Sequence, residues 1–353
     1  MRLFEHPVYR ASLERVLTDV NLDFLKDASV MVTGATGMVG SCLIDALALW
    51  NTAQNTPCRI IALSRSEDRA KERFSCIWKE PTFSFLAQDI SEPVQEFGEV
   101  SYIFHGASNA DPIQYALHPT DTFFSNILGT KNLLDYGLNH GAKRLLLISS
   151  GEIYGHPSSM ETSFSEDYCG PLDLTNPRSC YPEGKRAAEV LCQIYRQEFD
   201  ANVVIARPCH LFGPTMTTRD SRAVSEFLRA AVSGSPIKLK STGQVERSHC
   251  YIVDAIKALL TILKLGESGQ AYNIASPGCQ ATIRCFAETT AEVAGSQVVI
   301  STPTSLEARG YSTVKRTILD CQKLQNIGWE SHYTLKEGIQ ETLQILSELD
   351  RAK

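Results

Sequence analysis

The stretch that most restricts the fold runs from residue 28 to residue 50 and reads "ASVMVTGATGMVGSCLIDALALW". It begins with a short β-rich run, turns at Gly34, Gly37 and Gly40, and continues into an apolar segment of helical length. In such a turn the first glycine permits a tight bend, the second lets the backbone approach a pyrophosphate, and the third lets helix and strand pack closely. The helix N-terminus attracts negative charge. A turn can need glycine for its shape alone, but the strand before it and the helix after it predict a dinucleotide-binding site.

Five further apolar runs follow, and helical segments separate most of them. Each is short and rich in Val, Ile and Leu, as the buried strands of a parallel sheet are. Strands that alternate with helices predict the α/β class, with a doubly wound parallel sheet of the Rossmann type and helices on both faces. The five runs are "CRIIALSR" from residue 58, "FSFLAQDI" from 83, "YIFHGAS" from 102, "RLLLISS" from 144 and "NVVIARP" from 202.

This pattern divides the chain into three parts. Apolar residues near helical spacing predict an amphipathic helix over residues 9–26, so we assign residues 1–26 to an N-terminal helical extension. Residues 27–208 carry the alternating strands and helices and form the expected dinucleotide-binding Rossmann domain. From residue 209 the alternation loosens. We expect residues 209–353 to form mainly a smaller α/β substrate-binding lobe, with segments that return to the Rossmann core.

Composition excludes several classes of protein. A chain of 353 residues with 43% hydrophobic content can bury a large core, and its formal net charge of −6, without a long basic run, argues against a nucleic-acid partner. The 11 cysteines form no CxxC pair and no Cys/His cluster at zinc spacing, so we expect reduced core thiols and no metal. Since the chain lacks an apolar leader and any run of eighteen apolar residues, we predict a cytoplasmic protein with no membrane partner.

Two short motifs indicate chemistry. Tyr181 and Lys185 are four residues apart in "CYPEGKRAAE", so on a helix they face the same side. An ammonium near a phenol should lower the phenol pKa from about 10 by roughly one to three units and make it a usable base. Ser150 and Glu152 follow the apolar run that ends at residue 148, which places them at the end of a predicted strand. Together with the glycine turn, these residues predict a catalytic site.

With these motifs the chain resembles the extended short-chain dehydrogenases/reductases, the group of nucleotide-sugar epimerases and dehydratases. The resemblance covers about residues 29 to 346, and it is strongest toward the branch that decarboxylates UDP-glucuronate. The glycine turn and the Tyr/Lys pair specify only the superfamily, whereas two other stretches are more specific to that branch. These are "PRSCYPEGKRAAE" and "MTTRDSRAVSEF". The resemblance implies an enzyme with bound NAD, a nucleotide-sugar substrate and a homodimer formed by the helices after Asn126 and around Tyr181.

The resemblance also implies roles for the catalytic residues. Tyr181 would take the proton of the sugar 4-hydroxyl as C4 is oxidised, Lys185 would hold the nicotinamide ribose, and Ser150 would share the hydrogen bond to O4. Dehydratases of the group carry an Asp-Glu pair after the Ser or Thr, and simple epimerases carry small or neutral residues there. In this chain the two positions hold Gly151 and Glu152. This combination favours decarboxylation, with Glu152 placing the sugar or a water for protonation of C5.

Four residues are expected to meet the substrate. By resemblance, Asn126 is a buried polar residue near the site, although a buried asparagine can also simply satisfy backbone groups. Arg222 and Arg247 match arginines that bind the nucleotide and its diphosphate. His210 stands in "RPCHLFGP", where the group typically has an asparagine near the diphosphate. This departure leaves the identity of the nucleotide sugar open.

The cofactor site departs from the usual pattern at one position. NAD-binding members of the fold usually place an acidic residue at the end of the second strand, but this chain has Ser64 and Arg65. Arg65 could stack on adenine or bind a 2′-phosphate, which keeps NADP open beside NAD, or it could be a solvated surface charge. Asp89 could accept from the adenine amino group, or it could be a solvated loop carboxylate. The full cofactor set is Gly34, Thr36, Gly37, Met38, Val39, Gly40, Arg65, Asp89, Ile90, Ala107, Tyr181 and Lys185.

The resulting prediction is a nucleotide-sugar enzyme that oxidises C4 and decarboxylates UDP-glucuronate, giving UDP-xylose or a 4-keto pentose. The alternative is a 4,6-dehydratase, 4-epimerase or 4-reductase that acts on another nucleotide-activated sugar. A non-catalytic NADP-binding sensor on the same fold belongs to a different class. The intact set of Ser150, Tyr181 and Lys185 argues against a sensor, which has no use for a perturbed phenol.

Overall fold

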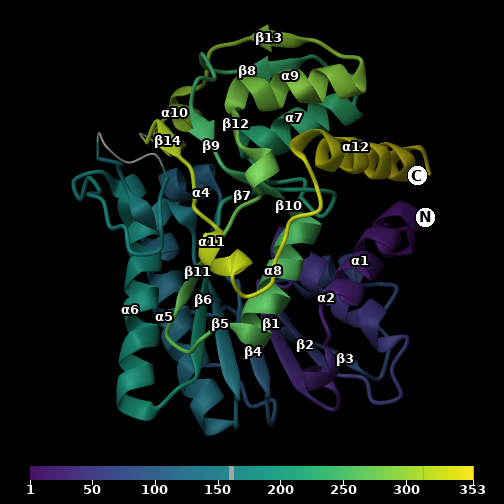
Figure 1. Ribbon diagram of the computed structural model, residues 1–353, viewed down its shortest axis with the longest axis vertical. Coiled ribbons are helices and arrows are strands. Elements are labelled where there is room, and N and C mark those ends of the chain that lie inside the picture. The colour runs from purple at the N-terminus through teal and green to yellow at the C-terminus, as the bar shows by residue number, and fades with distance from the viewer. Residues whose placement is uncertain (159–162, 313, 353) are drawn as a thin grey trace.

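The apolar runs predicted as strands form the centre of one parallel sheet in the computed structural model, which describes residues 1–158, 163–312 and 314–352 (Figure 1). The sheet has seven strands in the order β11-β6-β5-β4-β1-β2-β3, and every neighbouring pair is parallel. The chain therefore winds outward from β1 in both directions. Its strands are β1 (Ser29–Thr33), β2 (Arg59–Ser64), β3 (Phe83–Ala87), β4 (Tyr102–His105), β5 (Arg144–Ile148), β6 (Val203–Pro208) and β11 (Ala271–Ile274).

Both faces of this sheet are buried, as the apolar runs predict. Val30 and Val32 of β1 pack into a core with α2 (Met38–Asn51), whereas Met31 packs into a separate core on the other face. The second core includes residues of α5 (Pro119–Asn139) and α6 (Cys180–Phe199). Because successive side chains of a strand point to opposite faces, an uninterrupted apolar strand needs two such layers. The predicted doubly wound α/β class is confirmed.

The chain after residue 209 forms a smaller α/β lobe at the carboxyl ends of the strands (Figure 1). Two segments return to the main sheet: α8 (Ile252–Leu265) packs on β5 and β6, and β11 pairs with β6. The lobe strands are β7 (His210–Phe212), β8 (Ile237–Leu239), β9 (Glu246–Arg247), β10 (His249–Tyr251), β12 (Ala281–Thr282), β13 (Val298–Ile300) and β14 (Arg316–Thr317). The remaining helices are α1 (Pro7–Asp19), α3 (Glu67–Arg73), α4 (Pro112–Leu117), α7 (Ala223–Val232), α9 (Ile283–Ala294), α10 (Ser305–Gly310), α11 (Gln322–Gln325) and α12 (Leu335–Arg351).

The predicted N-terminal helix is wrong over its last turns. Helix α1 begins at Pro7 and ends at Asp19, and a short 3-10 turn over Asp23–Leu25 follows. The Asn21 side chain accepts a hydrogen bond of 2.8 Å from the Asp23 amide, and such local bonds compete with helix continuation. Helix α1 packs on α2, α8 and α12, so the N-terminal and C-terminal helices of the chain are in contact (Figure 1). No helix in the described part of the chain is long and apolar enough to cross a membrane.

Candidate active site

The glycine turn after β1 needs glycine for two separate physical reasons. Gly34 has a φ of 69°, and a Cβ at this position would lie 2.8 Å from the Gly106 carbonyl oxygen. A Cβ at Gly40 would lie 2.5 Å from the Gly34 carbonyl oxygen, so any larger residue would push α2 away from the turn. The turn thus brings the N-terminus of α2 against the ends of β1 and β4, where backbone N–H groups can meet a phosphate.

A groove of about 590 Å³ runs along this turn. Most of the predicted cofactor residues line it, and it ends at Gly106 and Ser108, which also line a smaller cavity of about 160 Å³ beside it. The residues of the predicted set that line the groove are Gly34, Thr36, Gly37, Arg65, Asp89, Ile90 and Ala107. Val39 lines the smaller cavity, while Met38 and Gly40 lie in the first turn of α2. The two spaces form one continuous path for a long ligand.

At the far end of the groove Arg65 is engaged by polar neighbours. Its guanidinium lies 3.9 Å from an Asp89 carboxylate oxygen and donates a 3.4 Å hydrogen bond to Asn109. Both charged side chains are largely solvent-exposed, at 62% and 46%. Asp89 therefore supplies a carboxylate to the groove from the end of β3, the strand next to the one that carries Arg65.

The smaller cavity holds the predicted catalytic residues. Ser150, at the end of β5, lies beside the Tyr181 phenol, and both line the cavity with Lys185. Tyr181 and Lys185 stand one turn apart near the start of α6, and both are buried. The Ser150 hydroxyl also accepts a 3.1 Å hydrogen bond from the Glu152 amide, which begins a 3-10 turn and directs Glu152 back into the cavity.

The prediction that the pKa of Tyr181 is lowered is wrong. Burial raises the pKa of Tyr181 to about 12, and the nearby Glu152 carboxylate adds to the rise. The Lys185 ammonium instead donates a 2.8 Å hydrogen bond to the Ile148 carbonyl, so it is committed to the strand end. Sequence spacing placed the two groups on one side of a helix, but it could not show which partner the ammonium would take.

An ion pair that the sequence did not reveal lies beside this cavity, in a small adjoining pocket that Glu152 also lines. The Arg178 guanidinium is 2.7 Å from a Glu152 carboxylate oxygen and 5.5 Å from the centre of the Tyr115 ring. That ring stacks on Tyr181, with 4.7 Å between centroids. Arg178 stands three residues before Tyr181, and this one-turn spacing was the available signal for it. Tyr115 comes from α4, far away in sequence, and no local pattern singles it out.

The other predicted substrate residues surround the same cavity. His210 and Arg222 line it, and Arg247 lines a small adjoining pocket with Arg178 and Glu152. Arg222 forms an ion pair with Asp220, whereas the hydrogen bonds of the buried Arg247 side chain go to the backbone carbonyls of Glu246 and Val314. Burial lowers the pKa of His210 well below its usual range, and Arg247 adds to the effect, so the imidazole is neutral. Two cations of the site, Lys185 and Arg247, thus donate to backbone carbonyls, whereas Arg178 and Arg222 pair with carboxylates.

Asn126 does not join this group. Its side-chain amide donates a 2.7 Å hydrogen bond to the Thr122 carbonyl within α5, and it packs against Gly184 of α6. A Cβ at Gly184 would lie 3.3 Å from that of Asn126, so this pair sets how closely the two helices approach. Gly184 is adjacent to Lys185 in sequence, but the Asn126 side chain faces the interface between α5 and α6.

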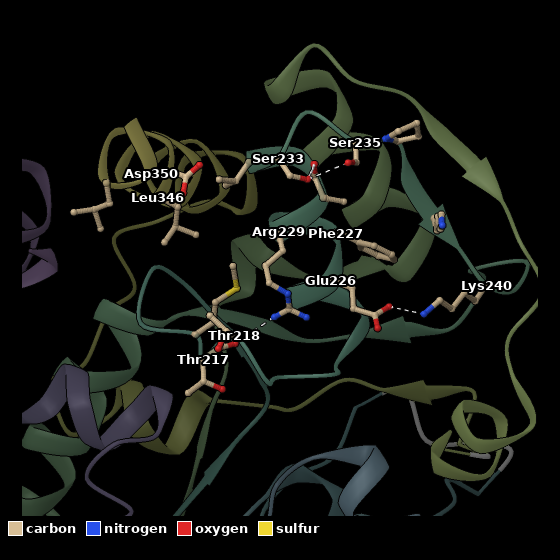
Figure 2. A pocket seen from close by; sticks show the side chains of 16 residues that line it. Thr217, Thr218, Glu226, Phe227, Arg229, Ser233, Ser235, Lys240, Leu346 and Asp350 are labelled. Carbon is tan, nitrogen blue, oxygen red and sulfur yellow. Dashed lines mark hydrogen bonds and ion pairs between the residues drawn. The ribbon is translucent and has the colours of Figure 1, made fainter. Parts of the chain in front are cut away.

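A hollow of about 760 Å³, larger than the groove, lies elsewhere, between α7, β8 and α12. Lys240 at its edge lies 2.8 Å from Glu226 (Figure 2). Lys240 also pairs with Glu307 of α10. Thr217 lines both this hollow and the cofactor groove. None of the predicted site residues lines the hollow. The groove and the small cavity, where the glycine turn and the buried ionisable groups meet, form the candidate active site.

Comparisons with known proteins agree with this fold. The model of the NAD dependent epimerase/dehydratase family matches residues 30–275. The chain is 32% identical over 320 residues to UDP-glucuronic acid decarboxylase 6 of Arabidopsis thaliana, covering 90% of this chain and 88% of the relative. It is 31% identical to UDP-glucuronic acid decarboxylase 1 of Xenopus tropicalis, over 89% and 71% of the two chains.

Solved structures show the same architecture. The fold matches dTDP-glucose 4,6-dehydratase from Bacillus anthracis, solved with NAD, with a TM-score of 0.76 at 20% identity, covering 92% of this chain and 98% of that one. It matches UDP-glucuronic acid 4-epimerase from Bacillus cereus, solved with UDP-glucuronic acid and NAD, with a TM-score of 0.76 at 22% identity over 91% and 99%. At these identities the likeness concerns the fold.

Proposed function

The chain belongs to the NAD dependent epimerase/dehydratase family, and on that premise we propose that it decarboxylates UDP-glucuronate to UDP-xylose or a UDP-4-keto pentose. The predicted resemblance to the decarboxylase branch agrees with the named relatives, which are UDP-glucuronic acid decarboxylases. The Tyr/Lys pair is common to the whole group, so the choice among its reactions depends on the residues around it.

One observation carries the choice of decarboxylation: position 151 holds no acid, and Leu319 packs against the place where a side chain would begin. A Cβ on Gly151 would lie 3.0 Å from a Leu319 methyl group, closer than side-chain carbons normally pack. An aspartate there, which could protonate a departing 6-hydroxyl, would push Leu319 aside. Glu152 is the acid that is present, and the Arg178 guanidinium forms an ion pair with it. An unpaired Glu152 would repel a carboxylate on the substrate, so the ion pair favours a substrate that carries a carboxylate.

The proposed chemistry starts at the sugar C4. Tyr181 takes the proton of the 4-hydroxyl, and Ser150 shares the hydrogen bond to that oxygen. With C4 as a ketone, the C5 carboxylate belongs to a β-keto acid, and its loss as carbon dioxide leaves an enolate that the ketone stabilises. Protonation at C5 gives the 4-keto pentose, and return to C4 of the hydride that its oxidation released, with a proton on O4, gives the pentose. Glu152 orients the sugar or a water beside C5 in this sequence.

The residues of the groove fit NAD. The glycine turn offers backbone N–H groups to the pyrophosphate, Asp89 offers a carboxylate at the adenosine end, and Lys185 offers an ammonium at the cavity end. Oxidised NAD would supply the hydride acceptor and a positive ring charge to this site. Because burial raises the pKa of Tyr181 to about 12, the tyrosine depends on such added positive charge to act as a base near neutral pH.

The arginines of the site fit an anionic substrate. Arg247 is only 4% exposed, and burial lowers its pKa to about 10, which means that its charge is poorly solvated. A buried charge that bonds mainly to carbonyl groups gains strongly when an anion arrives. We assign Arg247 and Arg222 to the diphosphate and the sugar end of the nucleotide sugar, with the neutral His210 as a hydrogen-bonding partner between them.

We also propose that the enzyme is a homodimer formed through α5 and α6. These two helices pack side by side on one face of the sheet (Figure 1). Phe124 on α5 is 49% exposed, and Val190 and Ile194 on α6, one turn apart, are 58% and 40% exposed. A contiguous apolar face on paired helices favours burial against a second copy of the same helices.

The decisive experiment is proton NMR of the purified protein with UDP-glucuronate and NAD, repeated separately with NADP. We expect the anomeric signal of UDP-xylose or a UDP-4-keto pentose to appear together with release of carbon dioxide, and the variant Tyr181→Phe to show neither. Conversion of UDP-glucuronate to its 4-epimer without carbon dioxide would overturn the decarboxylase proposal. No conversion with either cofactor would also overturn it, and CDP-, GDP- and dTDP-linked sugars would then be tested.

A further inference from the structure

Helix α6 meets the end of β5 through three side chains at successive turns. Tyr181, Lys185 and Glu189 are spaced by four residues, so they form one row along the helix. Tyr181 stands beside Ser150, and Lys185 donates to the carbonyl of residue 148. Glu189 completes the row, although the proposed reaction assigns it no role.

Glu189 binds Ser149, which lies between the two residues that Lys185 and Tyr181 contact. The Ser149 hydroxyl donates a hydrogen bond of 2.5 Å to a Glu189 carboxylate oxygen. The row on α6 thus binds three consecutive residues, 148, 149 and 150, at the point where β5 ends. A shift of the helix by one residue would break all three contacts together.

The Glu189 carboxylate is itself held from the next strand. Arg207 of β6 donates to both of its oxygens, at 3.1 and 2.7 Å, in a bidentate geometry. Arg207 also donates a 3.0 Å hydrogen bond to the Tyr154 hydroxyl, in the 3-10 turn that carries Glu152. Both ions are about nine-tenths buried, so removal of either partner would leave a costly unpaired charge.

We propose that Glu189 is a positioning residue of the active site. Through Ser149 and Arg207 it fixes the register between α6 and the end of β5, and its negative charge keeps Lys185 protonated. This inference rests on the proposed function for its consequence in catalysis. The register and the charge state of Lys185 can be tested without a substrate.

Few charges face Lys185, which makes the effect of Glu189 measurable. Burial lowers the pKa of Lys185 to about 8, and Glu189 opposes this lowering. The other ionisable groups around the ammonium include the Cys192 thiol and the Tyr181 phenol on α6 and His105 on β4. Glu152 and Arg222 line the same cavity, each in an ion pair, and Arg207 is the ion-pair partner of Glu189. Burial lowers the pKa of His105 to about 3, so the imidazole is neutral. Glu189 therefore supplies the main negative charge near Lys185 among the described residues.

The test is the NMR titration of the protein labelled with ¹⁵N at lysine side chains, saturated with NAD, with Lys185→Met identifying the signal. In Glu189→Gln, which keeps a hydrogen-bond acceptor for Ser149 but loses the charge, we expect the Lys185 midpoint to fall by about one unit or more. The matched control is Glu183→Gln, on the same helix. Glu183 pairs with Arg186 and is not among the charges that act on the pKa of Lys185, so this variant should leave the midpoint unchanged.

The pH dependence of turnover is a second measurement that tests the proposal. In Glu189→Gln the alkaline limb of the pH–rate profile should move to lower pH by the same amount as the Lys185 midpoint. An unchanged midpoint in a folded Glu189→Gln protein would overturn the proposal, whichever nucleotide sugar is the substrate. A lowered midpoint in a protein that does not decarboxylate UDP-glucuronate would support the positioning role and contradict only the proposed function. If Glu189→Gln does not fold, Ser149→Ala tests the register, with a loss of turnover expected at an unchanged Lys185 midpoint.

Discussion

Glu152 and Arg178 form an ion pair beside the catalytic cavity, with 2.7 Å between Oε2 and Nη1. The ion pair connects the 3-10 turn after β5, where Glu152 lies, to Arg178, which lies just before the start of α6 in the chain. It lies next to Tyr115 and Tyr181, whose rings stack with 4.7 Å between centroids. The cavity thus presents a neutralised carboxylate, a phenol and two further arginines to its ligand.

Removal of the Arg178 charge should lower kcat/KM for a hexuronate substrate. In Arg178→Ala the Glu152 carboxylate is left unpaired and repels the substrate carboxylate, and we expect kcat/KM for UDP-glucuronate to fall roughly 30-fold or more, since breaking such a pair costs about 2 kcal/mol or more. The double variant Arg178→Ala/Glu152→Gln should recover part of the loss. Steady-state kinetics of the unmodified protein, the single variants Arg178→Ala and Glu152→Gln, and the double variant gives the coupling energy. Strictly additive losses would contradict the paired role.

Loss of the Tyr181 hydroxyl should remove turnover and leave cofactor binding intact. General acid–base catalysis contributes about 10²- to 10⁴-fold, so Tyr181→Phe should lose activity within this range. Tyr195→Phe is the control, because Tyr195 lies on the same helix but bonds to Asp135. Calorimetric titration with NAD should give similar affinities for both variants. A Tyr181→Phe protein that retains most of its turnover would exclude this tyrosine as the base.

The adenosine end of the groove should prefer NAD to NADP. Arg65 is engaged by Asp89 and Asn109, and the Asp89 carboxylate would repel a 2′-phosphate. We expect Asp89→Asn to strengthen NADP binding severalfold while NAD affinity changes less, because specificity here is a difference between two binding free energies. Binding of both dinucleotides is measured by calorimetry. Tighter binding of NADP than of NAD to the unmodified protein would reverse the assignment of Asp89.

A surface charge on α6 should convert a dimer to monomers. Ile194→Glu places a carboxylate in the apolar face formed with α5, where a partner helix would have to bury it. Ile300→Glu is the control, since Ile300 is 66% exposed on β13 of the other lobe. Light scattering after size-exclusion chromatography should give the mass of a monomer for the first variant and of a dimer for the second. The same mass for both would place the interface elsewhere.

The pair of His140 and Glu96 should stabilise the fold only at low pH. Glu96 accepts from the imidazole at 2.8 Å and raises the pKa of His140 above its usual range, with burial acting against it. A histidine whose pKa is raised on folding stabilises below its unfolded pKa of about 6.5, and this contribution is lost as the pH rises through the folded value. Glu96→Gln should therefore lower the melting temperature at pH 5.5 and leave it unchanged at pH 9. Equal effects at both pH values would mean that the charge is not involved.

Local periodicity and turn chemistry were sufficient to predict much of this protein. The glycine turn, the apolar strands and the four-residue spacing of Tyr181 and Lys185 depend on neighbours within a few residues, where backbone geometry alone decides which side chains share a face. The strands ended slightly earlier than expected, at Ala87 and His105, because an apolar run does not show where hydrogen bonding stops. Strand β11 was expected only as a segment that returns to the core, because its pairing partner β6 is distant in sequence.

Only the tertiary structure decided how the site's charges are paired. Arg178 turns to Glu152, Lys185 turns to the end of β5, and Glu189 binds Ser149 and Arg207, although each could have faced solvent on local grounds. Likewise the pKa of Tyr181 rises because packing buries the phenol, and no spacing rule predicts that. The sequence by itself determined the fold class and the row of residues on α6, since these follow from helix and strand periods. Electrostatic partners depend on distances between segments and on exclusion of water, which exist only after the chain has folded.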